Sequence, residues 1–234
     1  MKDSLFYNQE SIQYSKKRYP KIARSYLQSF YTRRLTITKE YVRDILREAS
    51  PHPTLLEVGC ADGVIIRALG EEFTDIFAEL IGIDIALEMI KEARRRNTSP
   101  HATFFSRDEY QPRAVDVVVE TGVVNYADVE EELAFAHRNL ASGGWYILSI
   151  AGTDSLYNRL KHDSGLSDFR PYQEYDRLIR EKFQVERVEG VGLFIPYLWR
   201  IPAVARGVQS IIEPIMGKFF PGLCHEKMYL LKKK

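Results

Sequence analysis

The stretch that decides the fold runs from Thr54 to Asp84 and reads TLLEVGCADGVIIRALGEEFTDIFAELIGID. Its apolar run at 54–58 predicts a strand, its small residues at 59–63 a tight turn, and its apolar spacing at 64–69 a helix. A second apolar run at 80–83 predicts a strand that ends at an acid, Asp84. In a parallel sheet, the turn and this acid lie at the carboxyl edge, where α/β proteins bind ligands.

Three acids gather at this expected crevice: Glu57, Asp62 and Asp84. A dinucleotide site needs the pattern G-x-G-x-x-G/A, but Ala61 and Val64 stand at its second and third small positions. The acids also suit a pyrophosphate poorly. They favour a nucleoside ligand that carries positive charge and no phosphate, whose ribose hydroxyls Asp84 is placed to bind.

The segment Glu57–Gly63, EVGCADG, resembles the first motif of the class I S-adenosylmethionine-dependent methyltransferases, E/D-x-G-x-G-x-G, with Ala61 in place of the middle glycine. The resemblance implies an α/β fold with a doubly wound, Rossmann-like, seven-stranded sheet whose last strand is antiparallel. It also implies S-adenosyl-L-methionine as the cofactor. We expect a side chain added at Gly59 to fill the space of the ligand.

Composition sets limits on the class of protein. The chain has 234 residues and a net charge of +1, which indicates one α/β domain with additions and argues against a stable nucleic-acid partner. Its two cysteines, Cys60 and Cys224, form no disulfide framework or metal spacing, so a cytoplasmic location and no bound metal are expected. The N-terminus lacks an apolar signal core, and no uncharged apolar run approaches the ~18–20 residues of a membrane span.

Within the one domain we expect a helical cap over 1–50, a cofactor-binding core over 51–150, and a C-terminal half over 151–234. The cap holds eleven Lys/Arg and five Asp/Glu and should form two or three helices, interrupted at Pro20 and at 36–38. The resemblance makes four of its side chains candidates for closing the pocket: Tyr14, Arg18, Tyr19 and Arg34. Alternatively, the tyrosines simply pack this layer onto the core.

Two later strand ends complete the predicted cofactor site. By resemblance, Asp108, which follows a short strand at 102–105, is the acid that binds the adenine amino group. The strand at 114–120 ends beside Thr121 and Tyr126, where many amino-group methyltransferases carry D/N-P-P-Y/F. That tetrad is absent here. The predicted cofactor-binding set is Glu57, Gly59, Cys60, Ala61, Asp62, Gly63, Asp84, Ile85, Met89, Arg107, Asp108, Glu109, Glu120, Thr121, Tyr126, Tyr14, Tyr19 and Arg34.

Specificity is expected in the C-terminal half, in insertions at 151–182 and 193–223. A helix is predicted at 172–182, a strand at 183–188 and the last strand at 224–231. Residues 193–223 follow helical spacing, which four prolines should break into short pieces. A connection of this length usually has a task. It could be a lid over an apolar acceptor, a homodimer surface or a peripheral membrane contact.

Methyl transfer from a sulfonium is an in-line displacement, so positioning of donor and acceptor matters most. Candidates for a general base are His162, His225 and Glu120, and none is assigned. The first hypothesis is a methyltransferase for a small acceptor that is apolar or lipid- or carrier-linked, such as a quinone precursor. The alternatives are a non-catalytic nucleoside-binding module and an RNA or protein methyltransferase.

Overall fold

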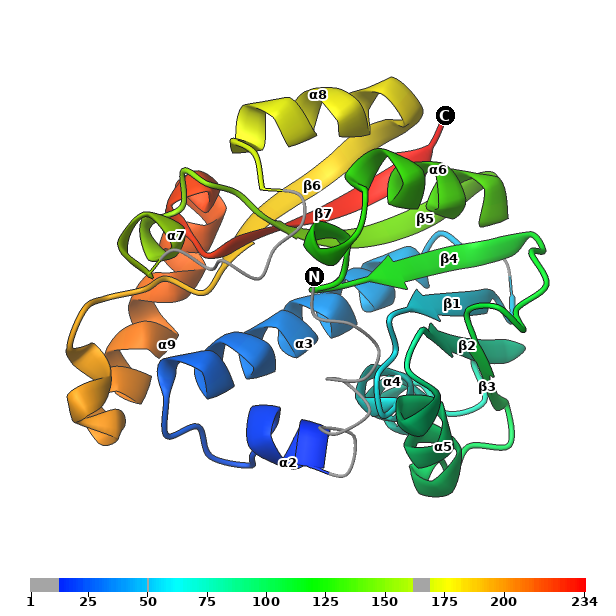
Figure 1. Ribbon diagram of the computed structural model, residues 1–234, viewed down its shortest axis with the longest axis horizontal. Helices are drawn as coiled ribbons and strands as arrows, with labels where there is room; N and C mark the ends of the chain where they lie inside the picture. Colours follow the sequence, from blue (N-terminus) through cyan, green and yellow to red (C-terminus); the bar gives the residue numbers. More distant parts are fainter. Residues whose placement is uncertain (1–12, 50, 162–168) are drawn as a thin grey trace.

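The computed structural model describes residues 13–49, 51–161 and 169–234, and it contains a seven-stranded sheet (Figure 1). The strand order is β3-β2-β1-β4-β5-β7-β6; strands β1 to β5 run parallel, and β7 is antiparallel to both β5 and β6. The strands are β1 Thr54–Val58, β2 Glu79–Asp84, β3 Ala102–Ser106, β4 Val115–Glu120, β5 Leu140–Ala151, β6 Phe183–Val191 and β7 Glu226–Lys233.

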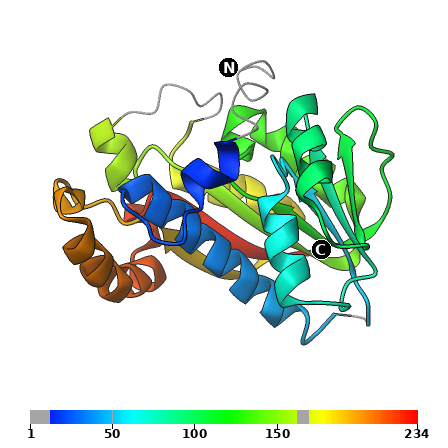
Figure 2. The same ribbon diagram turned by 90° about the horizontal axis from the view of Figure 1, so that it is seen from below.

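Helices cover both faces of the sheet (Figures 1 and 2). Helices α3, α4 and α5 pack on one face, and α6 and α8 pack on the other. The described helices are α2 Tyr14–Arg18, α3 Tyr26–Ile45, α4 Val64–Glu72, α5 Leu87–Arg96, α6 Val129–Asn139, α7 Leu156–Lys161, α8 Tyr172–Lys182 and α9 Pro202–Phe219. Short 3-10 turns occur at η2 Val124–Tyr126, η3 Leu198–Arg200 and η4 Pro221–Leu223.

The central strand β4 shows why the sheet is doubly covered. Val117 and Val119 belong to the core on the α3 face, whereas Val118 belongs to the core on the α6 face. All three are almost fully buried, as expected for a parallel strand with helices on both sides. The predicted fold class, including the N-terminal helical cap and the helical insertion before the last strand, is confirmed.

Helix α3 corrects the prediction of a break at 36–38, because it runs without interruption for 20 residues. The Ser25 side chain caps its start by accepting the Gln28 N–H. The hydroxyls of Thr36 and Thr38 donate to the carbonyls of Thr32 and Arg34, one turn earlier. These threonines therefore satisfy their hydroxyls within the helix instead of ending it.

Helix α9 corrects the prediction of short pieces in the insertion. It is one helix of 18 residues, with Pro202 in its first turn and Pro214 inside it. A proline at the first position removes no helical hydrogen bond, whereas Pro214 removes one. Packing against β6 holds the helix together in spite of this loss. Within the described part of the chain, no helix is long and apolar enough to cross a membrane.

Candidate cofactor and acceptor site

The turn between β1 and α4 is built from left-handed backbone. Gly59, Ala61 and Gly63 have φ values of +70°, +47° and +72°. The N–H groups of Gly59 and Cys60 both donate to the Ile83 carbonyl, at 2.8 and 2.9 Å, which fixes the turn to the end of β2. The turn therefore lies at the carboxyl edge of the sheet with its backbone held close to β2.

Ala61 is the strained member of this turn, because a Cβ atom disfavours left-handed backbone by roughly 1–2 kcal/mol. We predict that Ala61→Gly raises the free energy of unfolding by about 0.5–1 kcal/mol, since the added freedom of the unfolded chain offsets part of the gain. Urea unfolding would measure this difference. A lower stability of the variant would show that the alanine methyl makes a packing contribution larger than the strain.

Asp84 bonds both the β1–α4 turn and the short connection between β2 and α5. Its Oδ2 accepts the Ala61 N–H and its Oδ1 accepts the Ala86 N–H, both at 2.9 Å. Burial raises the pKa of Asp84, and these two N–H groups act in the opposite direction. The side chain is only partly buried, and each carboxylate oxygen has a second lone pair for a ligand hydroxyl.

Two further carboxylates lie beneath the turn. Glu57 is 2% exposed and Asp62 is 0% exposed. Among the described residues, Glu57 Oε2 and Asp62 Oδ1 have no hydrogen-bond partner, and burial raises the pKa of Glu57. Buried acceptors without partners are costly unless a ligand satisfies them. These carboxylate oxygens are hydrogen-bond acceptors, so they fit a ligand with cationic N–H groups.

The short helix α2 covers the turn. The Ser15 hydroxyl donates to Asp62 Oδ2, and Arg96 Nη1 lies 2.6 Å from the same oxygen. The Tyr14 side chain packs against Ala61, Ala86 and Met89. The structure thus brings predicted residues from the cap, the turn and α5 together in one place.

Arg34 lies at the tip of β4. It is 4% exposed, and its Nη1 is 3.3 Å from both carboxylate oxygens of Glu226. A Cβ added at Gly122 would lie only 2.1 Å from this nitrogen, so the guanidinium rests directly against the backbone after β4. Nearby, Thr121 Oγ1 is buried without a partner among the described residues. Polar groups of α3, β4 and β7 therefore meet at one point.

An aromatic cluster of Tyr26, Phe30, Tyr157, Phe194 and His225 continues from this point. The Tyr157 and His225 rings stack with centroids 3.9 Å apart, and Phe30 lies 4.7 Å from His225. Tyr26 stacks on Tyr157 at 5.2 Å and donates its hydroxyl to the Gly192 carbonyl at 2.9 Å. The sequence interpretation missed this cluster, because its members come from four separate segments with no shared spacing.

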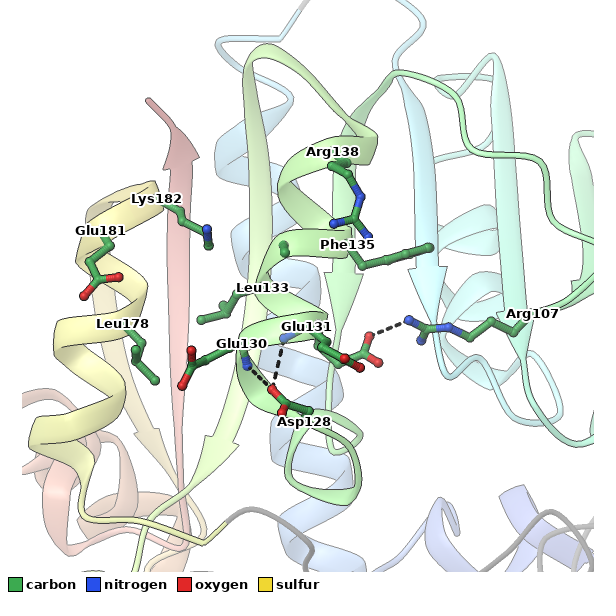
Figure 3. Close-up of a pocket in the computed structure, with 12 residues that line it drawn as sticks. Arg107, Asp128, Glu130, Glu131, Leu133, Phe135, Arg138, Leu178, Glu181 and Lys182 are labelled. Atoms are coloured by element: carbon green, nitrogen blue, oxygen red, sulfur yellow. Dashed lines mark hydrogen bonds and ion pairs between the residues drawn. The ribbon is translucent and has the colours of Figure 1, made fainter.

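The structure sends two of the predicted cofactor residues to the opposite face of the sheet. Glu120 accepts the Tyr146 hydroxyl at 2.7 Å beneath α6. Arg107 pairs with Glu132 at 2.9 Å and lies over the Phe135 ring (Figure 3). Side chains alternate between faces along a strand, so Glu120 at the tip of β4 need not point into the crevice.

Several other predicted residues are exposed or only half-buried. Asp108 and Glu109 are exposed after β3, and Glu109 accepts the Ser106 N–H at 3.1 Å. Ile85 is 56% exposed at the end of β2, and Tyr126 is half-buried in η2. The neighbouring Asn125 is structural: its side-chain amide bonds both backbone groups of Ala151 and so fixes the end of β5. His162 lies outside the described residues.

Burial, with the nearby charge of Glu132, raises the pKa of Glu120 to about 8. A carboxyl whose pKa is higher in the folded state stabilises the fold below its unfolded pKa of about 4.3, and this contribution is lost as pH rises towards 8. We predict that Glu120→Gln flattens the fall in stability over this range and stabilises the protein by a few kcal/mol at about pH 8.

Urea unfolding at several pH values would measure this effect. The control is Glu131→Gln, because Glu131 is an exposed carboxyl of α6, on the same side of the sheet. The control should keep the wild-type pH dependence. Equal slopes for wild type and Glu120→Gln would contradict a buried, protonated Glu120.

A surface cavity of about 620 Å³ lies on this second face and is lined mainly by residues of α6 and α8 (Figure 3). Its lining includes Glu130, Glu131, Glu181 and Lys182, and it includes no residue of the β1–α4 turn. Asp128, at its edge, caps α6 by accepting the N–H groups of Glu130 and Glu131. The cavity is therefore separate from the β1–α4 turn. In the described part of the chain, no cluster of His, Cys, Asp and Glu could hold a metal ion.

Comparison with known proteins agrees with this geometry. Residues 56–146 match the family model described as a methyltransferase domain. Magnesium protoporphyrin IX methyltransferase from Synechocystis PCC 6803, solved with bound S-adenosylhomocysteine, has a TM-score of 0.66 at 14% identity over 99% of this chain and 98% of that one. The N-methyltransferase NodS from Bradyrhizobium japonicum, in complex with the same ligand, has a TM-score of 0.57 at 16% identity over 87% of both chains.

A curated relative, an uncharacterized protein of Methanocaldococcus jannaschii, is 24% identical over 140 residues, which are 58% of this chain. The match spans about half the length of that relative (51%). The matched methyltransferase domain covers 91 of the 234 residues, and the fold is similar to that of S-adenosylmethionine-dependent methyltransferases of known structure. The same Synechocystis enzyme, solved also with bound S-adenosylmethionine, has a TM-score of 0.62 at 13% identity over 100% of this chain and 98% of that one.

Proposed function

We propose that this protein transfers a methyl group from S-adenosylmethionine to a small acceptor that is apolar or lipid- or carrier-linked. The observation that carries the proposal is the aromatic cluster, which adjoins Arg34 and the tip of β4 at the same sheet edge as the acidic turn. Aromatic walls recognise apolar and planar groups by contact area, with few polar contacts to fix orientation.

Within this proposal, the acidic turn is the cofactor site. Asp84 binds the ribose hydroxyls while its two backbone contacts hold the carboxylate in place. Glu57 and Asp62 supply partnerless carboxylate oxygens for a cationic ligand. When bound there, S-adenosylmethionine supplies an electrophilic methyl group on a sulfonium. Ile85 and Asp108 are the candidates for contacts to adenine, and Tyr14 for covering the turn.

The remaining task of the chain is to position the acceptor. Well-oriented reactants obtain roughly 7–11 kcal/mol from positioning alone. The buried pair of Arg34 and Glu226 is fixed at the boundary between the acidic turn and the aromatic cluster, so it can orient one polar group of an otherwise apolar acceptor. We assign no general base, and an acidic acceptor needs none.

Two measurements test the proposal. Calorimetry with S-adenosylhomocysteine should give a single site per chain, and S-adenosylmethionine with a labelled methyl group should transfer label to an extracted lipid or quinone-precursor fraction. Cofactor binding without transfer to any acceptor would favour a non-catalytic nucleoside-binding module. Label found in RNA or protein, with salt-sensitive binding of the acceptor, would favour the other alternative.

A further inference from the structure

Helix α9 buries polar side chains and exposes apolar ones. Its buried face carries Gln209 and Glu213, which bond each other at 2.6 Å. Gln209 donates to the Leu193 carbonyl, and Glu213 accepts the Gly192 N–H at 2.8 Å. The apolar side chains instead point away from the protein. We call them the α9 outer face: Ile201, Val204, Ile211, Ile215, Phe219 and Phe220.

This face is far more exposed than an apolar surface normally is. Ile211 is 69% exposed and Phe219 is 66% exposed. Val204, Ile211, Ile215 and Phe219 recur at helical spacing along one side, and Ile201 and Phe220 flank the two ends of the helix. Contiguous exposed apolar patches mark binding surfaces for proteins or membranes. The helix meets β6 through its polar side, so the α9 outer face points away from the sheet.

The exposed charges of the segment that carries the α9 outer face are all positive. Between residues 194 and 224 the exposed charged side chains are Arg200, Arg206 and Lys218, while the acid of this segment, Glu213, is buried. Arg206 Nη1 also bonds the Ala23 carbonyl at 3.0 Å, which ties α9 to the loop before α3. That loop lies within residues 16–39, which contain no Asp or Glu.

The loop extends the same surface. Lys21 and Arg24 are exposed, and Ile22 between them is 61% exposed. Figures 1 and 2 show α9 and the start of α3 at the same end of the molecule, away from β3. The surface is therefore an apolar stripe about 27 Å long, by the rise of an 18-residue helix, with Arg200 and Lys218 near its two ends.

We propose that the α9 outer face docks on the surface of an anionic lipid bilayer. Interfacial helices insert an apolar face roughly 5–10 Å deep and place basic side chains among the headgroups. A second copy of the chain fits less well, because a two-fold interface through this face would set its cations against the same cations of the partner. Membrane docking does not depend on the proposed methyl transfer.

Docking has a consequence for the aromatic cluster. Gly192 accepts the Tyr26 hydroxyl of the aromatic cluster through its carbonyl and donates its N–H to Glu213 of α9. A single residue thus links the docking helix to the acceptor side of the molecule. A bilayer held at α9 would place this side, and not the α6 face, nearest to the lipid.

The test is flotation of the full chain with phosphatidylcholine vesicles, with and without phosphatidylglycerol. We expect binding that requires phosphatidylglycerol. The double variant Ile211→Gln/Phe219→Gln should lower vesicle binding roughly tenfold or more. Its matched control is Ile76→Gln, an exposed isoleucine before β2, which should bind as wild type does.

Two double variants with the same change in net charge measure the electrostatic contribution to vesicle binding. Arg200→Gln/Lys218→Gln should weaken binding roughly fivefold for each cation removed, whereas Lys91→Gln/Arg138→Gln, with the same change in net charge elsewhere, should not. Brominated phosphatidylglycerol should quench Trp199, which lies beside α9 and bonds Gln209.

Three results would overturn the proposal. The first is no vesicle binding by a folded wild-type chain, with folding checked by thermal unfolding. The second is equal binding to neutral and anionic vesicles. The third is a dimer that Ile211→Gln/Phe219→Gln dissociates while vesicles remain unbound, which would make this face a surface between copies. Since S-adenosylhomocysteine binding and methyl transfer are measured without vesicles, failure here is distinct from failure of the proposed function.

Discussion

Asp84→Ala is expected to weaken S-adenosylhomocysteine binding about 100-fold or more. The substitution removes the acceptor of two backbone N–H groups, Ala61 and Ala86, as well as the proposed acceptor of the ribose hydroxyls. Hydrogen bonds to a charged group contribute about 1.5–3 kcal/mol each, so losing the ligand contacts and loosening both turns should act together. Isothermal titration calorimetry would measure the affinity, and urea unfolding the accompanying loss of stability.

Asp128→Ala provides a matched control, because Asp128 also accepts two backbone N–H groups but does so at the start of α6. It should cost stability, about 1 kcal/mol for a lost helix cap, and leave the cofactor affinity unchanged. Asp84→Asn should fall between wild type and Asp84→Ala, since its amide oxygen keeps one acceptor. Wild-type affinity in Asp84→Ala would remove this residue from ligand binding.

The sheet could be predicted from sequence because its strands are apolar runs separated by turns or helical spacing. The stretch at 54–58, the acid that ends β2 and the helix at 172–182 all correspond to elements of the structure. The last strand lies at Glu226–Lys233, two residues beyond its predicted bounds. Cys224 and His225 have the sequence pattern of a strand but precede the first residue that pairs with β5. Element type followed from periodicity, and the boundaries followed from tertiary pairing.

Two helices were mispredicted for one reason. Threonines in α3 and prolines in α9 are local helix-breaking signals, yet both helices continue because packing on the sheet outweighs about one lost hydrogen bond or a small loss of propensity. The helical spacing of 201, 204, 211 and 215 was visible, but the burial of Gln209 and Glu213 on the other side was not. Periodicity identifies an apolar face without telling which way it points.

The candidate site shows a similar division. The acids and small residues of the β1–α4 turn are adjacent in sequence, so their meeting with Asp84 followed from the strand order. The aromatic cluster could not be predicted, because it forms only when α3, α7, the segment after β6 and the residue before β7 converge. Glu120 shows the converse: its place in sequence was right for the crevice, but its side chain points to the other face.

The structure also changes the reason for expecting Gly59 to be intolerant of substitution. A Cβ at Gly59 would lie 2.2 Å from Val123 Cγ2, so it collides with the chain itself before it reaches the space of a ligand. Gly59 also has a φ of +70°, where a side chain costs roughly 1–2 kcal/mol. Gly59→Ala should therefore lose about 2–5 kcal/mol of stability, as strain and overpacking add, and should lose detectable binding of S-adenosylhomocysteine.

Gly143→Ala separates the two causes, because Gly143 has the same φ of +70° but nothing within 4 Å of an added Cβ. It should lose only the roughly 1–2 kcal/mol of backbone strain and keep wild-type cofactor affinity. In Gly59→Ala/Val123→Ala the collision is relieved, so the clash part of the loss should be recovered while the strain remains. Urea unfolding and calorimetry on the three variants would measure this. If Gly59→Ala and Gly143→Ala proved equal in both stability and affinity, the turn would not need the close approach to Val123 that the structure shows.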